Sequence, residues 1–322
     1  MTQNPASAAA DIQFHRIDRF SPQDMDGVIE SAHAEHVQLG RGEFNGSLLR
    51  VKSDGKTFDS GIYSQAILGR ACMPADRVFV GLVLPAQTGG LLEGYKLDLP
   101  TPYLYTECVE LGCRLEPGTR WFGFQVSRKE IEAYGLQLPD KYSGVVDCGS
   151  GSRRRLVNEF ATTLQSLTGV AAPNLNLINS AHLADDHFDR LLAAFVNTLS
   201  SEPSHASSMA LSRHQQLVRK AQEYMDVHMQ ETVLIRDLCT MLNVTPKTLE
   251  RALAHVTGVT PHYYLSINRL SHARRLLLNG SRESTRISDI ALACGYDHIG
   301  RFSVNYRRWF GESPSQTLSS AS

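Results

Sequence analysis

The sequence lacks the long apolar runs of membrane proteins and the cysteine density of secreted ones. Its longest apolar stretch, residues 78–86, is broken by Pro85 and falls far short of the ~18 residues that a membrane-spanning helix needs. Residues 1–10 have neither a basic region nor an apolar core, so we identify no secretory signal there. The six cysteines form no C-x-x-C pair, which favours reduced, buried thiols over disulfides or a zinc site. We therefore expect a cytoplasmic protein without a membrane span.

A net charge of either sign is also missing, because 32 basic side chains face 33 acidic ones. This balance argues against a nucleic-acid partner, for which a basic domain is typical. However, the charge is divided unevenly along the chain. Residues 1–210 have a net charge of −6, whereas residues 211–322 hold 14 basic and 9 acidic side chains, a net charge of +5. The two halves are therefore expected to have different partners.

The length of the chain, 322 residues, predicts two domains at roughly 100–200 residues each. A Ser-rich segment with one proline, residues 200–208, lacks apolar periodicity and is typical of a linker. We therefore predict a first domain over residues 1–200, a linker over 201–212 and a second domain over 213–322.

The first domain is expected to begin with β structure and to end with helices. Short runs with β character, separated by glycine and proline, favour a small antiparallel barrel or sandwich. Apolar residues at helical spacing follow from Leu156 to Leu167 and again over 188–199, which predicts two closing helices. Their apolar faces are interpreted as core, with dimerisation as the second interpretation. The predicted strands are 47–51, 78–84, 97–99, 103–109 and 121–126.

The second domain is expected to be almost entirely helical. Thr245-Pro246 and Thr260-Pro261 each combine an N-cap residue with a proline at the first helical position. Gly258 marks the end of the helix between them. A tight turn at 243–244 separates two of the helices, as in a helix-turn-helix unit. The predicted helices span 217–225, 235–242, 247–256 and 262–278.

The second domain also contains an internal repeat. Ile235 pairs with Ile287 at an offset of 52 residues, and after the turn Leu249 pairs with Phe302 at an offset of 53. The matches predict two helix-turn-helix units. The joining helix, ~26 Å long at ~1.5 Å per residue, can hold two recognition helices near the ~34 Å that separates successive major grooves on one face of B-DNA. The alternative, an all-helical dimerisation domain, does not account for the excess positive charge.

Residues 287–315, ISDIALACGYDHIGRFSVNYRRWFGESPS, resemble the signature of the AraC/XylS family of bacterial transcription regulators, and the likeness covers residues 217–318. The resemblance implies an α+β protein with a C-terminal double helix-turn-helix. It also implies an N-terminal effector-binding and dimerisation domain with a cupin-like β structure. The implied function is that of an activator that acts as a homodimer. Its implied partners are double-stranded DNA, RNA polymerase and a small-molecule effector.

The family pattern places the base contacts of the first unit on one face of its second helix. The side chains found there suit this role, since Lys or Arg donates to guanine O6 and N7, and Glu accepts from cytosine N4. These candidate readers are Lys247, Thr248, Glu250 and Arg251.

The second unit departs from the family pattern. Where relatives often carry Ser and a basic residue, this chain has Gly300 and Val304. We therefore expect the second unit to depend more on phosphate contacts or DNA shape. The candidates that remain are His298 and Arg301 for base edges, Ile299 for a thymine methyl group, and Arg307 and Arg308 for phosphates.

Histidine is missing where a cupin enzyme needs it. Such enzymes hold their metal with histidines from the barrel strands, and no His lies between His36 and His182. His33 and His36, like His182 and His187, lack a third ligand at matching spacing and are interpreted as surface residues. Nucleophile-elbow and P-loop spacings are also absent. We therefore predict no metal, no cofactor and no enzymatic activity.

One polar cluster, residues 147–155, ends the β region. Small residues followed by three arginines at a helix start can hold an anion. The cluster bears a loose likeness to the arginine-plus-Asp-x-Ser-x-x-Gly arrangement of PilZ cyclic-di-GMP sensors, in a different order and spacing. An anionic nucleotide such as cyclic di-GMP is therefore one candidate effector, and a turn before a solvated helix start is the alternative. The candidate contacts are Ser150, Arg153, Arg154 and Arg155, joined by Arg70 and Arg77 if the fold brings them together.

Two other functions fit the same sequence. The chain could be a ligand-binding β-domain protein or an enzyme whose helical C-terminal part only dimerises. It could also be a regulator without an effector, whose first domain only dimerises. A steep loss of binding to duplex DNA with added salt would indicate counterion release and favour a regulator.

Overall fold

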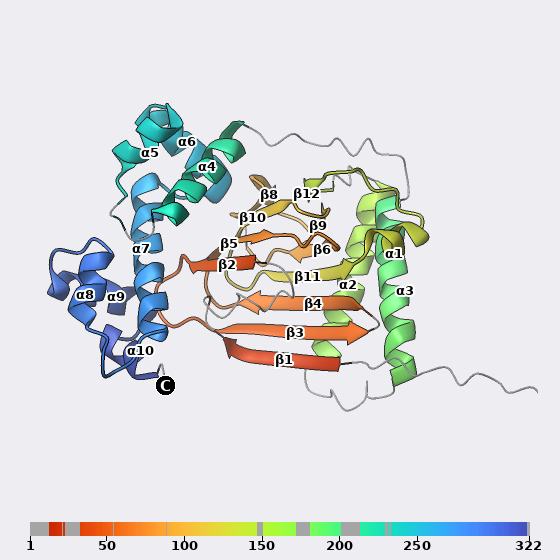
Figure 1. Ribbon diagram of the computed structural model, residues 1–322. Helices are drawn as coiled ribbons and strands as arrows, with labels where there is room; N and C mark the ends of the chain where they lie inside the picture. The colour runs from red at the N-terminus through yellow and green to blue at the C-terminus, as the bar shows by residue number, and fades with distance from the viewer. Residues whose placement is uncertain are drawn as a thin grey trace, which may run out of the picture.

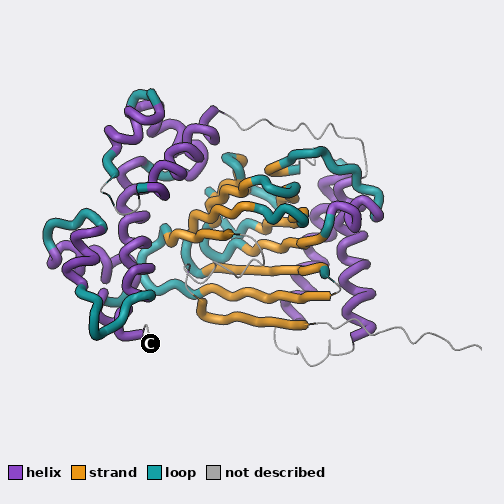
Figure 2. Tube along the Cα trace, viewed as in Figure 1, coloured by secondary structure: helices purple, strands orange, loops and turns teal. Residues whose placement is uncertain are grey.

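The computed structural model describes residues 13–20, 22, 33–53, 55–87, 89–146, 151–171, 181–200, 213–228, 231 and 233–320. Two β-sheets lie at its centre (Figure 1). Helices α2 (Ser152–Ala171) and α3 (Ala181–Ser200) cover one side, and the helices from α4 (Arg213–Val227) to α10 (Pro314–Ser320) lie on the other. Figure 2 shows that the strands all belong to the N-terminal part of the chain. Antiparallel sheets followed by a helical domain confirm the predicted fold class.

Every strand pairing in the two sheets is antiparallel. In spatial order, the seven-stranded sheet consists of β1 (Gln13–Phe20), β3 (Gly46–Ser53), β4 (Lys56–Tyr63), β11 (Arg120–Val126), β6 (Val78–Leu84), β9 (Thr101–Tyr105) and β12 (Ser143–Val145). The five-stranded sheet consists of β2 (His33–Gln38), β5 (Ile67–Cys72), β10 (Glu110–Leu115), β7 (Gly90–Leu92) and β8 (Tyr95–Leu97).

Strand β6 is apolar along its whole length because both of its faces are covered. Val80 and Leu82 point into the core under α2 and α3, whereas Phe79 and Val83 point into the space between the two sheets. Successive side chains of a strand alternate between faces, so an unbroken apolar run is typical of a strand buried on both sides. The helical cover completes this core, and the ring of Phe124 on β11 lies 5.5 Å from that of Phe188 on α3. The predicted pair of closing helices is therefore confirmed.

Aromatic side chains fill the space between the sheets. Tyr63, Tyr103 and Trp121 are each buried there. The Trp121 indole N–H donates to the Tyr63 hydroxyl at 2.9 Å, and the Tyr103 hydroxyl donates to a backbone carbonyl at 2.7 Å. Gly61 makes room for this packing, because a Cβ atom there would lie 2.5 Å from the Trp121 ring. The sandwich interior is thus a packed core rather than a ligand chamber.

The helical domain begins and ends its helices where local signals predict. Thr245 and Thr260 accept hydrogen bonds from the backbone of the first turns of α6 (Pro246–Thr257) and α7 (Pro261–Leu278). Gly258, with φ +72°, ends α6 in the left-handed conformation that favours glycine. The remaining helices are α1 (Arg128–Ala133), α5 (Ile235–Leu242), α8 (Ile287–Ala293) and α9 (Ile299–Phe310).

The sequence predicted less of the β region correctly. The predicted strand 78–84 coincides with β6, and the other predicted strands correspond to β3, β8, β9 and β11 with shifted bounds. The remaining strands were not predicted. One cause is visible in β4, where Asp59 is fully buried and pairs with Arg50 at 2.7 Å. A charged residue that faces the core disrupts the alternation of apolar and polar side chains by which a strand is recognised. The predicted linker, 201–212, lies outside the described residues.

The interpretation of the histidines also needs correction. Strands β1 and β2 carry His15, His33 and His36, so the sheets are not free of histidine. His36 is not a surface residue, because its Nδ1 is buried and burial lowers the pKa of the ring to about 4. The described residues contain no group of three or more His, Cys, Asp or Glu side chains that could hold a metal ion. Within the same part of the chain, no helix is long and apolar enough to cross a membrane.

Candidate nucleic-acid interface

Two helix-turn-helix units, α5–α6 and α8–α9, are joined by α7. The inward-facing residues of the two second helices match, since Leu249 and Leu253 on α6 and Phe302 and Tyr306 on α9 are all 0–1% exposed. Each turn contains a residue in the left-handed conformation, Asn243 in the first unit and a glycine in the second. The 18 residues of α7 span about 27 Å at ~1.5 Å per residue. The predicted repeat is therefore present as two copies of one structural unit.

The outward face of α6 carries the predicted readers of the first unit. Lys247, Glu250 and Arg251 are exposed, and none of them has an ion-pair partner within the described part of the chain. Thr248 is half-buried, and its hydroxyl lies 3.0 Å from that of the N-cap residue Thr245. This face therefore offers two cations and a carboxylate to a ligand, with Thr248 tied to the start of the helix.

The outward face of α9 carries the predicted contacts of the second unit. His298 precedes the helix as its N-cap residue without capping it through its side chain. Ile299 is 48% exposed, and Arg301, Arg307 and Arg308 are exposed along the helix. The chain thus presents both faces to solvent, and we call them together the candidate DNA-binding surface.

Sequence reasoning missed two further cations next to this surface. Arg236 lies in the first turn of α5 with a side chain that is 80% exposed, and Arg286 is the exposed N-cap residue of α8. The first helix of a helix-turn-helix unit crosses the DNA backbone. Both arginines were recognisable from the sequence, since each lies at the start of the first helix of its repeat.

The structure describes only part of the predicted effector cluster, and it places Arg70 and Arg77 elsewhere. Arg154 donates to the Pro100 carbonyl at 2.8 Å, Arg153 is half-buried and Arg155 is exposed at the start of α2. Arg77 donates to the Gly55 carbonyl, and Arg70 projects from β5 towards α4. Arg70 and Arg77 therefore do not join the cluster, and Ser150 lies outside the described residues.

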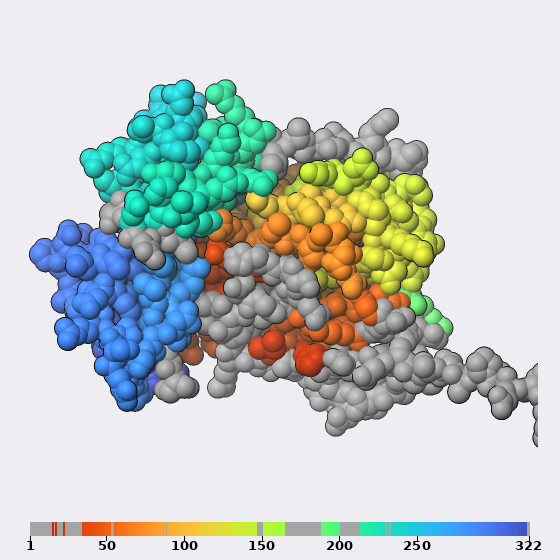
Figure 3. Space-filling view, viewed as in Figure 1, coloured from red at the N-terminus to blue at the C-terminus, as the bar shows by residue number. Residues whose placement is uncertain are grey.

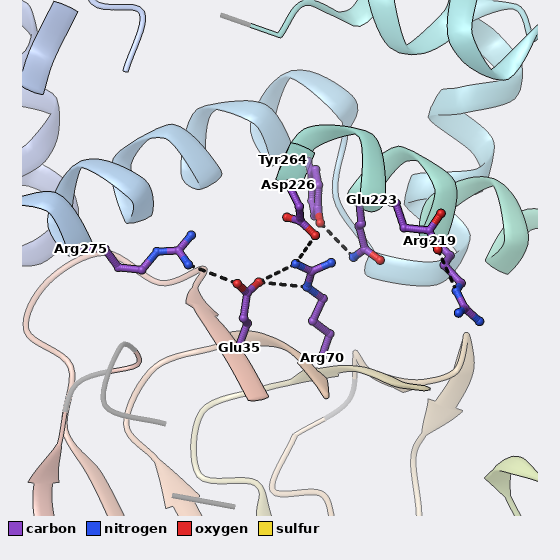
Figure 4. Close-up of polar contacts among 8 residues, drawn as sticks. Glu35, Arg70, Arg219, Glu223, Asp226, Tyr264 and Arg275 are labelled. Carbon is purple, nitrogen blue, oxygen red and sulfur yellow. Dashed lines mark hydrogen bonds and ion pairs between the residues drawn. The ribbon is translucent and has the colours of Figure 1, made fainter. Parts of the chain in front are cut away.

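Arg70 instead links the two domains. Figure 4 shows its guanidinium between Glu35 on β2 and Asp226 on α4, with Nη2–carboxylate distances of 2.7 and 2.5 Å, while Arg275 on α7 reaches Glu35 at 3.1 Å. Burial of the Glu35 carboxylate raises its pKa, but Arg70 and Arg275 outweigh this effect and hold the pKa below its usual value. The opposite balance holds at Asp226, where burial raises the pKa despite Arg70. We call these four residues the ion cluster.

The end of β2 and the loop after it contact the joining helix α7 and the second unit. The Trp309 indole on α9 donates to the Gln38 carbonyl at 3.2 Å, and the Tyr263 hydroxyl on α7 donates to the Leu39 carbonyl at 2.8 Å. Leu39 and Leu68 belong to the apolar core of the helical domain. At the other end of the sheet, Gln215 on α4 donates to the Glu93 carbonyl at 2.8 Å. Arg114 on β10 donates to the Gly258 carbonyl at the end of α6 at 2.9 Å. The five-stranded sheet therefore contacts both units.

A cavity of about 420 Å³ lies between the five-stranded sheet and the helices. Val37, Leu68 and Leu111 come from the sheet, whereas Val218, Met225 and Leu265 come from α4 and α7, and the ion cluster forms part of the wall. Glu93 also lines it, and burial raises the pKa of this carboxyl to about 7, although Gly112 and Gln215 donate to it. Figure 3 shows the helices packed against the sheet at this junction. The size and the mixed apolar and polar lining are typical of a small-molecule pocket.

Comparison with known proteins bears on the helical domain. A family model described as a helix-turn-helix domain matches residues 238–320. The chain is 32% identical over 102 residues to a probable thc operon regulatory protein of Rhodococcus erythropolis, a match that covers 32% of the chain and 31% of that protein. It is 28% identical over 141 residues to XylDLEGF operon transcriptional activator 2 of Pseudomonas putida, which covers 44% of the chain and 88% of the relative.

Among solved structures, an AraC-type transcriptional regulator from Chromobacterium violaceum is 29% identical to this chain. The match covers 34% of the chain and 94% of that structure, with a TM-score of 0.31. The chain spans about a third of the length of the Rhodococcus relative. These relatives are transcription regulators, not enzymes.

Proposed function

We propose that the chain is an activator of the AraC/XylS type that recognises two successive major grooves of DNA and responds to a small molecule. The proposal is supported by the helix-turn-helix family model that matches residues 238–320 and by the similarity to a transcriptional activator of Pseudomonas putida. The observation that carries the DNA part is the repeated helix-turn-helix with its outward polar face. On α6, this face combines Lys247 and Arg251, which can donate to guanine, with Glu250, which can accept from cytosine. Arg236, Arg286, Arg307 and Arg308 are assigned to phosphates.

Selection of bound duplexes from a random pool tests this function. We expect one asymmetric site with two half-sites about one helical turn apart, and an affinity that falls steeply with salt as phosphate counterions are released. A protein that selects no sequence and shows no retention on DNA at low salt would contradict the proposal and favour a helical domain that only dimerises.

We also propose that the effector binds in the cavity between the domains. This placement is supported by the packed sandwich interior, which leaves the cavity as the concave apolar surface next to the helices. A ligand held by walls from both domains binds one domain arrangement better than another, which is the requirement for coupling. Homodimerisation and contact with RNA polymerase are included in the proposal, because the family resemblance implies both.

Filling the cavity tests the effector site. A panel of small acids, aromatic compounds and nucleotides, cyclic di-GMP among them, is screened by calorimetry against the full chain. We expect Leu111→Trp, which adds bulk to the cavity wall, to abolish the heat of a binding compound. Leu99→Trp is the matched control, because Leu99 is 55% exposed and does not line the cavity. Equal loss in both variants, or binding that persists in Leu111→Trp, would contradict this placement.

A further inference from the structure

The two recognition helices carry different chemistry at equivalent positions. The 53-residue offset that aligns the buried pair Leu249 and Phe302 also aligns Lys247 with Gly300 and Arg251 with Val304. Because the inward residues of the two helices match, the outward residues two positions before and after them occupy equivalent places on each helix. Two cations of the first unit are thus replaced by a glycine and a valine in the second.

The replacement leaves an apolar patch on the outward face of α9. Val304 is 67% exposed and Ile299 is 48% exposed. A Cβ atom on Gly300, which follows Ile299 and lies one helical turn before Val304 on the same face, would meet nothing within 4 Å. Neither branched side chain is buried by the fold, so packing within the chain does not account for them. We call Ile299, Gly300 and Val304 the apolar patch.

The charges around the patch indicate what covers it. Arg301 lies beside it, and Arg308 follows Val304 by one helical turn. An apolar patch next to positively charged side chains is complementary to a ligand that carries an apolar group on a negatively charged surface. In the major groove of DNA that group is the C5-methyl group of thymine, which accepts apolar contact from a protein. Gly300 lets the helix backbone approach the base edges closely.

We propose that Ile299 and Val304 read thymine methyl groups, so that the second half-site is specified by thymines whereas the first is specified by hydrogen bonds to α6. The inference rests on the proposed DNA-binding function and names the readout of its second unit. The two half-sites therefore differ in chemistry, which makes the complete site directional.

The test removes single methyl groups from DNA. In the site obtained by selection, each thymine of the second half-site is replaced by deoxyuridine, which lacks only the C5-methyl group. We expect full-length protein to lose about fourfold in affinity at each contacted position, the equivalent of one buried methylene group. Val304→Ala is expected to bind the thymine and deoxyuridine forms of its contacted position equally. Because Val304 is exposed, this variant should fold like the parent chain.

Arg251→Ala is the matched control, because it alters the equivalent position of the first unit. It should lose discrimination in the first half-site and keep the preference for thymine in the second. A second half-site without thymine, or a thymine preference that survives in both Val304→Ala and Ile299→Ala, would overturn the inference while leaving DNA binding intact. In that outcome the apolar patch would instead contact another protein. Absence of any sequence-specific binding would overturn the proposed function as well.

Discussion

Two exposed arginines of the candidate DNA-binding surface are expected to have different roles, because they lie at different ends of their helices. Arg251 lies in the first half of α6, the half that enters the groove in a helix-turn-helix unit, whereas Arg307 lies in the last turn of α9. We expect Arg251→Ala to lose ~1–3 kcal/mol of discrimination at particular base pairs. Arg307→Ala is expected to weaken binding to all sequences and to reduce the salt slope by about 1.

A series of single base-pair changes in the selected site, titrated against each variant, separates the two roles. The parent chain supplies the reference profile of affinity against base pair. If Arg251→Ala lowers the affinity for every sequence by the same factor, it contacts a phosphate and our assignment of this residue to base readout is wrong.

His36 makes the stability of the first domain depend on pH. Burial lowers the pKa of its ring from 6.5 to about 4, so between these values the unfolded chain binds more protons than the folded chain. Stability is therefore expected to fall as the pH decreases through this window, by about 3 kcal/mol in total. Glu93 has the opposite effect, since its raised pKa stabilises the fold at low pH.

The contribution of His36 is isolated by comparing the parent chain with His36→Gln in chemical denaturation between pH 4 and 7. We expect the difference in stability between the two chains to change across this range. His15→Gln is the control, because His15 is exposed on β1. A constant difference between parent and His36→Gln would show that folding does not lower the pKa of the His36 ring.

At the scale of the element, one glycine in each helix-turn-helix unit has a different structural role. Gly258 ends α6 at φ +72°, and Gly300 lies inside α9 with open space around it. A Cβ atom in the left-handed conformation costs ~1–2 kcal/mol, so Gly258→Ala should destabilise the protein by that amount. Gly300→Ala should leave the stability equal or slightly higher, since alanine is the better helix former. Urea denaturation of both variants checks this pair, and a loss in Gly300→Ala would contradict it.

The helical elements were predictable because their signals are local. A capping threonine, a proline at the first helical position and a terminal glycine are close in sequence to the helix that they delimit. They predicted the bounds of α6 and α7 to within a residue or two at each end. Strand β4 was not predictable, because the buried Asp59 is compensated by Arg50 on a different strand. The prediction that Arg70 and Arg77 join the effector cluster was wrong for a related reason. Whether Arg70 meets Arg153 or Asp226 depends on the packing of whole elements, which spacing along the chain does not contain.

At the scale of the whole molecule, the ion cluster joins the two domains into one unit. Arg70→Gln removes the positive charge that pairs with both Glu35 and Asp226, so each carboxylate loses its ion pair with residue 70. We expect the helical domain to separate from the sheet more easily, so that a single calorimetric unfolding transition resolves into two. Arg77→Gln is the control, because Arg77 contacts Gly55 away from this interface. An unchanged single transition in Arg70→Gln would mean that the apolar contacts alone hold the domains together.

The contact between Gln38 and Trp309 joins residues that are 271 positions apart. Strand β2 forms one edge of the five-stranded sheet. During synthesis it leaves the ribosome long before α9 is translated, so this edge remains exposed for most of the time that translation takes. Contacts of such sequence separation form slowly, and exposed strand edges are prone to pair with other chains while they wait. Loss of both α7 and α9 through premature termination would therefore leave this edge exposed permanently, and a truncated chain would be prone to aggregate as well as unable to bind DNA.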